Sequence, residues 1–427
     1  MVRHKNNFIS TRSGGRSPRL TRPRTTALLV TAATLLLLCA CAEEKSIDPD
    51  NSIIVGLLLP FTGGDAALGA AYERAAILAK DVVNDAGGID GKPLVFVTRD
   101  THSDPDRAKA SLEEILAYPV AAVIGPESSE IAGTAVTRTA QEETTLLSPV
   151  ISGAADIEIP ESVDWFRLAP SSALLGRAFA NYLIDNDLTV IAAVYSNEEY
   201  HVDFAESFVA QFTALGGTVE ESIVLAPGRT GYGDDVLKLK ALGTRNILFS
   251  ASTRDAARFV NDLITTDTTD RFHWYLSPPL ETPVLLENAY KGALEGAEGI
   301  GIQVYDADEE FIEKYQSRWN DTPTDGTFFY YDAVALLALS LQRTALTEDG
   351  KIPNDTLQEM IRATVKPQGI QINWDTLGDG MEQLEDGNTI NYLGLTGRVV
   401  FKDGQQVIAP MKIWRIEDNE FVPIDEI

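Results

Sequence analysis

Serine side chains follow two short apolar runs in the first half of the chain, where they could bind a ligand. Ser128 and Ser129 come after the run Val120–Ile124 and a Gly-Pro turn. Ser152 follows a second run that contains Ser148-Pro149. Such runs are typical of buried parallel strands, whose carboxyl ends meet at one edge of a sheet. Hydroxyls and free N–H groups at a helix start favour anionic groups, although serine there also serves as an ordinary helix cap. We therefore predict that these serines form one wall of a site for a small solute.

Residues that carry catalysis or hold metals are scarce. The histidines are His4, His102, His201 and His273, and none has a metal-ligand spacing. Gly231-Tyr232-Gly233 lacks the third glycine of a dinucleotide site, and no serine has the glycine flanks of a nucleophile elbow. His102 with Asp100 and Asp104 is either a metal cluster or a polar loop, and we favour the loop. We predict no enzyme activity, no cofactor and no metal, with a hydrolase as the remotest alternative.

The first 40 residues are typical of an export signal. They contain seven basic residues and no acid, followed by the apolar run Ala27–Ala40. The alternative is a transmembrane anchor, for which the run is short. Its end, Leu38-Cys39-Ala40-Cys41, resembles a bacterial lipobox. That resemblance implies cleavage before Cys41 and a lipid on its sulfur, with Cys39 as a weaker candidate. We predict a signal peptide at 1–40 and a polar tether at 41–51.

The charge of the chain excludes some partners. The 427 residues carry a net charge of −28 from 35 basic and 63 acidic residues. Without the seven basic residues of the signal, 28 basic residues face 63 acids, and the charge becomes −35. Such a surface repels nucleic acid and anionic lipid headgroups. We expect an exported monomer, periplasmic or at the cell surface, that reaches the membrane through its lipid and binds no nucleic acid.

Apolar runs and helical periodicity alternate along most of the chain. From Ile53 to Ile151 the predicted order is strand, helix, strand, helix, strand, helix, strand. The stretch Trp165–Ser171 interrupts the pattern, which restarts with a helix at Leu174 and continues to a strand at 274–276. Short strands and a hairpin follow near the C-terminus. This pattern predicts an α/β fold with two doubly wound lobes.

Several segments together resemble one family, the type 1 periplasmic solute-binding proteins of ABC transporters in the leucine/isoleucine/valine class. The resemblance extends from about Ile53 to the end of the chain. The segments that carry it are Leu59–Gly63, Asn84–Pro93, Ile124–Ser129, Ser148-Pro149, Phe166–Ser171, Lys238–Gly243, Glu298-Gly299, Tyr331–Val334 and Leu395–Gly397.

The resemblance implies two lobes that close on a ligand cleft and are joined by three crossovers, near Ala169, near Tyr305 and before Arg398. Lobe 1 would comprise residues 52–169 and 306–380, and lobe 2 residues 170–305 and 381–427. Ser129, preceded by Ser128, matches the position that binds the ligand carboxylate. The carbonyl of Val150 and the hydroxyl of Ser152, with Ile151 between them, match the groups that hold the ligand ammonium.

In the second lobe, the resemblance places a covering aromatic at Tyr200. The next family tyrosine falls on Ser252, and the family's acidic partner of the ammonium falls near Pro278. Glu281 lies three residues away, and Glu127 adds a negative charge at the first-lobe turn, so a cationic ligand is one alternative.

The resulting prediction is a lipid-anchored solute-binding subunit of an ABC importer, with a permease and an ATPase as partners. The ligand is an amino acid or a related amide or carboxylate. The alternative is the same fold used as a ligand sensor or envelope scaffold without transport.

Overall fold

The computed structural model describes residues 47–153, 165–266, 272–303, 309–402, 405–408 and 410–427. The predicted signal peptide, Cys41, most of the tether and the predicted crossover near Tyr305 lie outside these ranges. Residues Pro49–Ile427 form one compact unit. No helix in the described ranges combines the length and apolarity needed to span a membrane.

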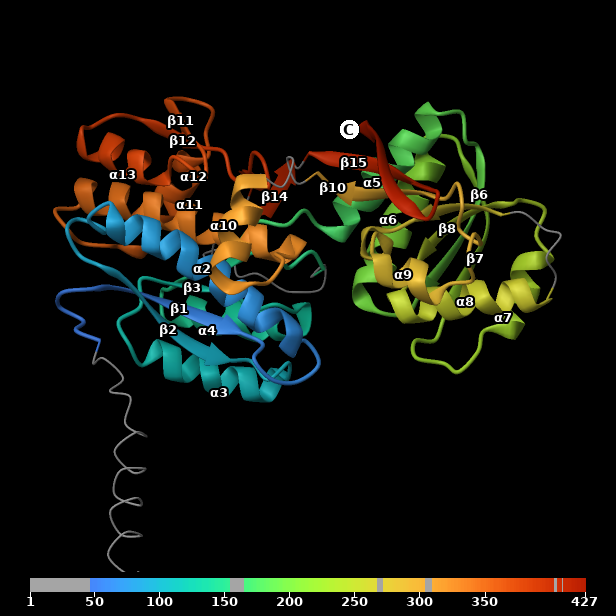
Figure 1. The fold of residues 1–427 in the computed structure, drawn as a ribbon, viewed down its shortest axis with the longest axis horizontal. Helices are drawn as coiled ribbons and strands as arrows, with labels where there is room; N and C mark the ends of the chain where they lie inside the picture. The colour runs from blue at the N-terminus through green and yellow to red at the C-terminus, as the bar shows by residue number, and fades with distance from the viewer. Residues whose placement is uncertain (1–46, 154–164, 267–271, 304–308, 403–404, 409) are drawn as a thin grey trace, which may run out of the picture. The chain divides into compact units, whose positions relative to one another are not determined.

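The first sheet has the strand order β13-β14-β5-β4-β3-β1-β2. Its strands β1, β2 and β3 lie together in Figure 1. Strands β1 to β5 run parallel, and every residue of β1 is buried, as expected for a central strand covered on both faces. The order reverses between β1 and β3, which is where open α/β sheets bind ligands. The strands are β1 (Ile53–Leu59), β2 (Leu94–Asp100), β3 (Ala122–Ile124), β4 (Thr145–Ser148), β5 (Trp165–Arg167), β13 (Val400–Lys402) and β14 (Gln405–Ile408).

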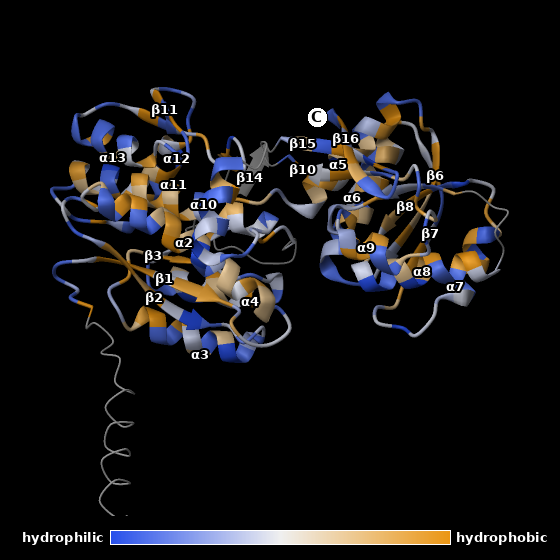
Figure 2. Ribbon diagram, in the orientation of Figure 1, coloured by the Kyte–Doolittle hydropathy of each residue, from blue (hydrophilic) through white to orange (hydrophobic). Residues whose placement is uncertain are grey.

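Helices cover both faces of this sheet, with α2 and α11 on one side and α3 on the other in Figure 1. Helix α11 is buried along most of its length and packs on α2, where the rings of Tyr72 and Tyr330 stack with centroids 4.3 Å apart. Figure 2 shows both β1 and α11 as largely apolar. The helices are α2 (Ala66–Asp85), α3 (Pro105–Leu116), α4 (Ser129–Gln141), α10 (Glu309–Trp319), α11 (Asp325–Thr347), α12 (Asn354–Thr364) and α13 (Leu377–Glu385). A separate pair of parallel strands consists of β11 (Ile370–Ile372) and β12 (Ile390–Tyr392).

Asp332 of α11 is a fully buried carboxylate that fixes the chain after β12. Its Oδ1 accepts hydrogen bonds from the Tyr392 hydroxyl at 2.8 Å and the Leu395 N–H at 2.9 Å. Its Oδ2 accepts from the N–H and hydroxyl of Thr396 at 2.8 and 2.6 Å. Burial raises the pKa of Asp332, and the hydrogen bonds oppose that rise. Because both oxygens are satisfied, the burial of this group is tolerated.

The second sheet has the order β16-β15-β10-β9-β8-β6-β7, with β15 and β16 antiparallel to their neighbours. Its order reverses between β6 and β8, so this sheet has the same kind of switch point as the first. The strands are β6 (Val190–Ser196), β7 (Thr218–Leu225), β8 (Asn246–Ser250), β9 (His273–Leu276), β10 (Glu298–Ile302), β15 (Met411–Glu417) and β16 (Glu420–Glu426). The helices of this part are α5 (Ser172–Asp185), α6 (Glu199–Ala214), α7 (Gly233–Lys240), α8 (Thr253–Thr266), η1 (Pro278–Leu280) and α9 (Pro283–Asn288).

Alternate side chains of β6 enter different cores. Ile191, Ala193 and Tyr195 pack with α5 and α6, whereas Ala192 and Val194 pack with α7 and α8. This alternation follows from the two-residue period of a strand, and it explains why β6 is apolar on both faces. The predicted α/β fold with two doubly wound sheets is confirmed.

Two details of the topology were not visible in the sequence. Trp165–Arg167, which we took as a break in the pattern, forms β5 of the first sheet. Strands β13 and β14, which follow Arg398, also belong to the first sheet, and the chain enters the second sheet at β15. The residues that we assigned to lobe 2 at 381–427 are thus distributed over both sheets, and the lobe limits remain a prediction.

Candidate functional site

The turn after β3 brings two predicted site residues to the switch point of the first sheet. Gly125 has φ +120°, and a Cβ there would lie 2.2 Å from the carbonyl oxygen of Leu58, so the close approach to β1 requires glycine. The Gly125-Pro126 peptide is cis. Ser128 is the N-cap of α4, but its side chain makes no capping hydrogen bond among the described residues. Its hydroxyl is therefore not used to close the helix. Ser129, the first residue of α4, is half-buried.

The turn after β4 is joined to the turn after β3. The buried Ser148 hydroxyl donates to the carbonyl of Gly125 at 2.8 Å and accepts from the indole N–H of Trp165 at 2.8 Å. Beyond it, Val150 is half-buried against the first core, Ile151 is buried and Ser152 is half-buried. These bonds place the two predicted first-lobe segments at adjacent strand ends, as the spacing predicted.

The backbone after Ser152 is held on two sides. The carbonyl of Ser152 accepts a hydrogen bond from the N–H of Ser172 at 3.0 Å. Arg167, only 5% exposed, donates from Nη1 to the carbonyl of Gly153 at 3.1 Å, and its guanidinium lies 4.8 Å from the centre of the Trp165 ring. Burial lowers the pKa of Arg167, and Asp203 opposes this effect. We assigned Arg167 no role from sequence, and the available signal was a charged residue directly after the apolar pair Trp165-Phe166.

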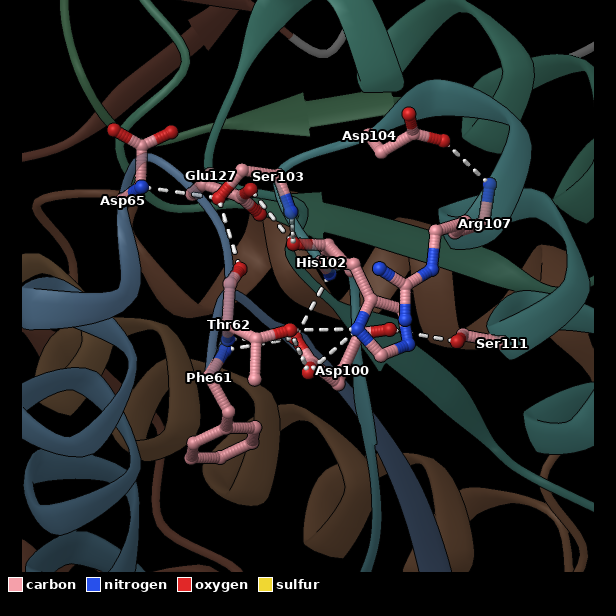
Figure 3. Close-up of polar contacts among 11 residues, drawn as sticks. Phe61, Thr62, Asp65, Asp100, His102, Ser103, Asp104, Arg107, Ser111 and Glu127 are labelled. Atoms are coloured by element: carbon pink, nitrogen blue, oxygen red, sulfur yellow. Dashed lines mark hydrogen bonds and ion pairs between the residues drawn. The ribbon is translucent and has the colours of Figure 1, made fainter.

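Glu127 lies at the same strand end, with its carboxyl group turned toward the loops after β1 and β2 (Figure 3). Oε1 accepts from the Thr101 hydroxyl at 2.7 Å, whereas Oε2 is buried without a hydrogen-bond partner among the described residues. Burial raises the pKa of Glu127, and the charges of Asp65 and Asp100 raise it further. The group is thus poised to hold a proton more readily than an exposed glutamate.

Asp100 connects the loops after β1 and β2 (Figure 3). Its carboxylate accepts from the N–H groups of Phe61, Thr62 and His102 at 2.8, 3.1 and 2.8 Å, and from the Thr62 hydroxyl at 2.6 Å. These bonds outweigh burial and lower the pKa of Asp100. Asp104 instead caps α3 by accepting from the N–H of Arg107 at 2.9 Å. No group of three candidate metal ligands occurs in the part of the chain that the structure describes, and the geometry of these residues is that of a hydrogen-bonded loop.

Tyr200 and Ser252 lie beside the switch point of the second sheet. Tyr200 is half-buried at the start of α6, and its ring contacts that of His201 edge-on with centroids 5.4 Å apart. Burial raises the pKa of Tyr200. His201 shares a hydrogen bond of 2.8 Å between Nδ1 and Oγ of Ser250, at the end of β8. The Ser252 hydroxyl accepts from the N–H of Asp255 at 3.3 Å, so it caps α8.

Two positions were considered for an acid that pairs with a ligand ammonium, and neither offers a free carboxylate in the described structure. Pro278 starts η1 and supplies no charge. Glu281 lies 2.6 Å from Nζ of Lys412, and neither side chain is more than a quarter exposed. Burial raises the pKa of Glu281, and Lys412 opposes the rise. Glu281 is therefore already neutralised, which weakens the alternative of a cationic ligand held by Glu127 and Glu281 together.

A cavity of about 660 Å³ lies along α8 and α9. Its lining includes Thr253, Arg254, Arg258, Asn261 and Val284. None of the predicted site residues lines this cavity. The candidate site is therefore defined by the strand ends at the two switch points and not by this cavity.

Comparison with known proteins gives a family and several relatives. The sequence model of the family described as "Periplasmic binding protein" matches residues 52–420. "Leu/Ile/Val-binding protein homolog 3" of Brucella melitensis is 24% identical over 198 residues, which are 46% of this chain and 54% of the relative. The chain thus spans about half the length of this curated relative.

Two further similarities extend over most of the chain. "Chemotactic signal transduction system substrate-binding protein BasB" of Halobacterium salinarum is 24% identical over 86% of this chain and 87% of its own. The crystal structure of a putative branched-chain amino acid ABC transporter from Rhodospirillum rubrum has a TM-score of 0.69 and 23% identity, and covers 87% of this chain and all of its own. At that identity, the structural similarity shows the fold alone.

Proposed function

Because the chain belongs to the periplasmic binding protein family, we propose that it is the solute-binding subunit of an ABC importer, with an amino acid or a related amide or carboxylate as its ligand. The observation that carries this proposal is the joining of two strand ends by Ser148. It supports the proposal because the segments that contain Ser128, Ser129 and Ser152 follow the two joined strands. Hydroxyls at the start of a helix suit a carboxylate.

The pose of the ligand follows from the groups at this edge. Its carboxylate would meet the hydroxyl of Ser129 and the N–H groups of the first turn of α4. Its ammonium would meet the carbonyl of Val150 and the hydroxyl of Ser152. Tyr200 of the second lobe would cover the apolar part of the ligand on lobe closure, and its phenol would supply a donor. Ser252 contributes through its place at the start of α8, where its own hydroxyl already caps the helix.

The export and anchoring of the chain form part of the same proposal. A lipid on Cys41 would keep a strongly acidic protein near a membrane that it would otherwise leave. Residues 41–51 would serve as the tether between the lipid and β1. A permease and an ATPase would complete the importer. This assignment makes the chain a carrier of solute, and catalysis has no part in it.

Calorimetric titration of the chain from residue 42 onward tests the ligand class. The ligands are the standard L-amino acids, their amides and the corresponding carboxylic acids. We expect one group to bind with a dissociation constant of about 1 μM or below, which corresponds to about −8 kcal/mol. If none bound more tightly than about 1 mM, the amino-acid proposal would fail.

Uptake of the labelled ligand in cells that lack the chain tests the importer role. We expect uptake to be lost and to return when the intact chain is supplied. A Cys41→Ser chain should be exported but released from the membrane. Unchanged uptake would favour the ligand sensor or envelope scaffold instead, a use of the fold consistent with the name of the Halobacterium relative.

A further inference from the structure

The cavity along α8 and α9 is separate from the strand ends and has a positively charged wall. Its volume of about 660 Å³ is in the range of sites for small molecules. Arg254 and Arg258 both line it. They lie four residues apart on α8, so they share one face of the helix, with Cβ atoms about 5–6 Å apart. Two guanidinium groups therefore border the same cavity.

The charges of these two arginines are not neutralised by acids. Neither Arg254 nor Arg258 forms an ion pair with another residue that the structure describes. Nη1 of Arg258 donates to the backbone carbonyl of Arg229, a neutral group that fixes the guanidinium and leaves its charge in place. Arg229 itself is paired with Asp235 at 2.6 Å. The positive charge of the cavity wall is thus available to a ligand.

The acids on α8 are engaged with backbone N–H groups. Asp262 also lines the cavity, and its Oδ2 accepts from the N–H of Tyr232 at 2.6 Å. Asp255 is buried, and its Oδ2 accepts from the N–H of Gly228 at 2.8 Å. Among the described lining residues, two arginines face one aspartate, which gives a net charge of +1. This local excess is notable in a chain whose total charge is −28.

Hydrogen bonds hold the walls of the cavity in place. Nδ2 of Asn261 on α8 donates to the carbonyl of Asn288 at 2.9 Å, and its Oδ1 accepts from the N–H of Tyr290 at 2.6 Å. These bonds fix the end of α9 on α8, and the two helices lie side by side in Figure 1. The bonds from Asp255 and Asp262 fix the loop before α7 in the same way. Binding a ligand here therefore requires little ordering of the protein.

The two ends of the cavity differ in chemistry. Thr253 and Arg254 lie at the start of α8, where the N–H groups of the first turn also favour an anion. Asp262 lies about two turns further along the helix. A carboxylate there accepts hydrogen bonds from hydroxyl groups and repels anions. The ligand should thus carry its negative charge at one end and hydroxyl groups at the other.

We propose that this cavity is a second ligand site, which takes a small soluble phosphate monoester with a hydroxylated body. Two guanidinium groups match the nearly two negative charges and the oxygen geometry of a phosphate monoester better than the single charge of a carboxylate. The acidic surface of the chain repels anionic membranes, which favours a soluble phosphate over a lipid headgroup. The site lies away from the strand ends of the proposed function and does not depend on that function.

Calorimetric titration of the chain with glycerol phosphate, inorganic phosphate and glycerol tests the site. Glycerol phosphate should bind with a dissociation constant of about 100 μM or below, at least about tenfold more tightly than inorganic phosphate, and glycerol should not bind. Arg254→Gln should weaken this binding by about tenfold or more. Its melting temperature without phosphate should stay unchanged, because Arg254 is exposed.

Two further variants separate the guanidinium groups from charge in general. Arg258→Lys keeps the charge but loses the planar fork, so it should bind more weakly than the wild type and more tightly than Arg258→Gln. Arg177→Gln removes an exposed arginine of α5 that does not line the cavity. It is the matched control and should change the affinity for glycerol phosphate by less than about twofold.

Each contrary outcome overturns a defined part of the inference. If glycerol phosphate does not bind, or if Arg254→Gln binds it as tightly as the wild type, the site is not where we place it. Equal binding of inorganic phosphate would overturn the ligand class. Binding only to vesicles that contain phosphatidylglycerol would identify a lipid headgroup and overturn the soluble ligand. Displacement of a bound amino acid by glycerol phosphate would place the phosphate at the strand ends. Failure of amino-acid binding would leave this test unaffected.

Discussion

The carboxylate of Glu281 and the ammonium of Lys412 form an ion pair at 2.6 Å, and both side chains are at least three-quarters buried. Lys412 lies on β15, the strand that returns antiparallel to β10. Because the partner of Glu281 comes from 131 positions further along the chain, the proximity of Glu281 to Pro278 in sequence is a poor guide to its role. The charge of Glu281 is compensated within the protein by Lys412.

This pairing predicts that Glu281→Gln leaves ligand affinity unchanged. Lys412→Met should instead lower the free energy of unfolding by about 1–3 kcal/mol, because it leaves a mostly buried carboxylate without its cation. Urea denaturation and calorimetry measure the two effects. Lys109→Met, at an exposed position, is the control and should change stability by less than about 0.5 kcal/mol. A large loss of affinity in Glu281→Gln would contradict the pairing argument.

Replacing Glu127 should raise stability at neutral pH, whereas Lys412→Met should lower it. A carboxyl group whose pKa is raised on folding binds its proton more tightly in the folded state. Its contribution is therefore fully present below the unfolded pKa and is lost as pH rises through the folded pKa. Glu127→Gln should stabilise the chain at pH 7.5 relative to the wild type by about 1 kcal/mol, and the difference should disappear near pH 4.

Urea denaturation at those two pH values measures this difference. Glu130→Gln, an exposed acid in the first turn of α4, is the control. The change in stability caused by Glu130→Gln should have the same sign at both pH values, because Glu130 is exposed whereas Glu127 is largely buried. A Glu127→Gln variant that is less stable than the wild type at pH 7.5 would show that the buried oxygen is satisfied in solution.

Much of the first-lobe site could be predicted because its determinants are local. A short apolar run, a Gly-Pro turn and a following serine all act within ten residues, so the strand ends and the positions of Ser128, Ser129 and Ser152 follow from near neighbours. The match of the family over residues 52–420 confirms the resemblance that these segments indicated. The role of each serine in binding stays a prediction.

The parts that could not be predicted depend on distant pairs. Three residues that end in an arginine do not signal a strand, and β5 forms because β4 and β14 flank it. Glu199 gives no sign in the sequence that it lies beside Gly153, because the two residues belong to the start of α6 and the turn after β4, which are far apart along the chain. Periodicity locates elements along the chain, but tertiary packing decides which charged side chains meet.

His201 predicts a loss of stability in mild acid. Burial lowers its pKa to about 4, whereas an unfolded histidine titrates near 6.5. The folded state then binds fewer protons than the unfolded state between these values, so stability falls as pH drops from about 6.5 to about 4, by about 3 kcal/mol at most. The groups around the ring are Ser250, Tyr200 and Asp255, and the charge of Asp255 opposes the shift. His201→Gln should flatten this part of the stability curve, whereas His273→Gln, at an exposed position, should not.

The substitution Gly153→Ala should weaken ligand binding without destabilising the fold. A Cβ at this position would lie 2.9 Å from Oγ of Ser129, closer than such atoms normally approach, so Gly153→Ala must displace the serine hydroxyl. The fold should tolerate this, because Ser129 is half-buried and its side chain can rotate. We expect ligand affinity to fall by about tenfold, which is the loss of one good hydrogen bond, with little change in melting temperature.

The matched control is Gly233→Ala, where an added Cβ meets nothing within 4 Å and the backbone has no positive φ. Ser129→Ala should weaken binding to a similar degree, and adding Gly153→Ala to it should cost little more, because the displaced hydroxyl is already absent. Full additivity of the two losses would mean that Gly153 and Ser129 act on the ligand independently. In that case the site would not be organised around the contact between α4 and the turn after β4.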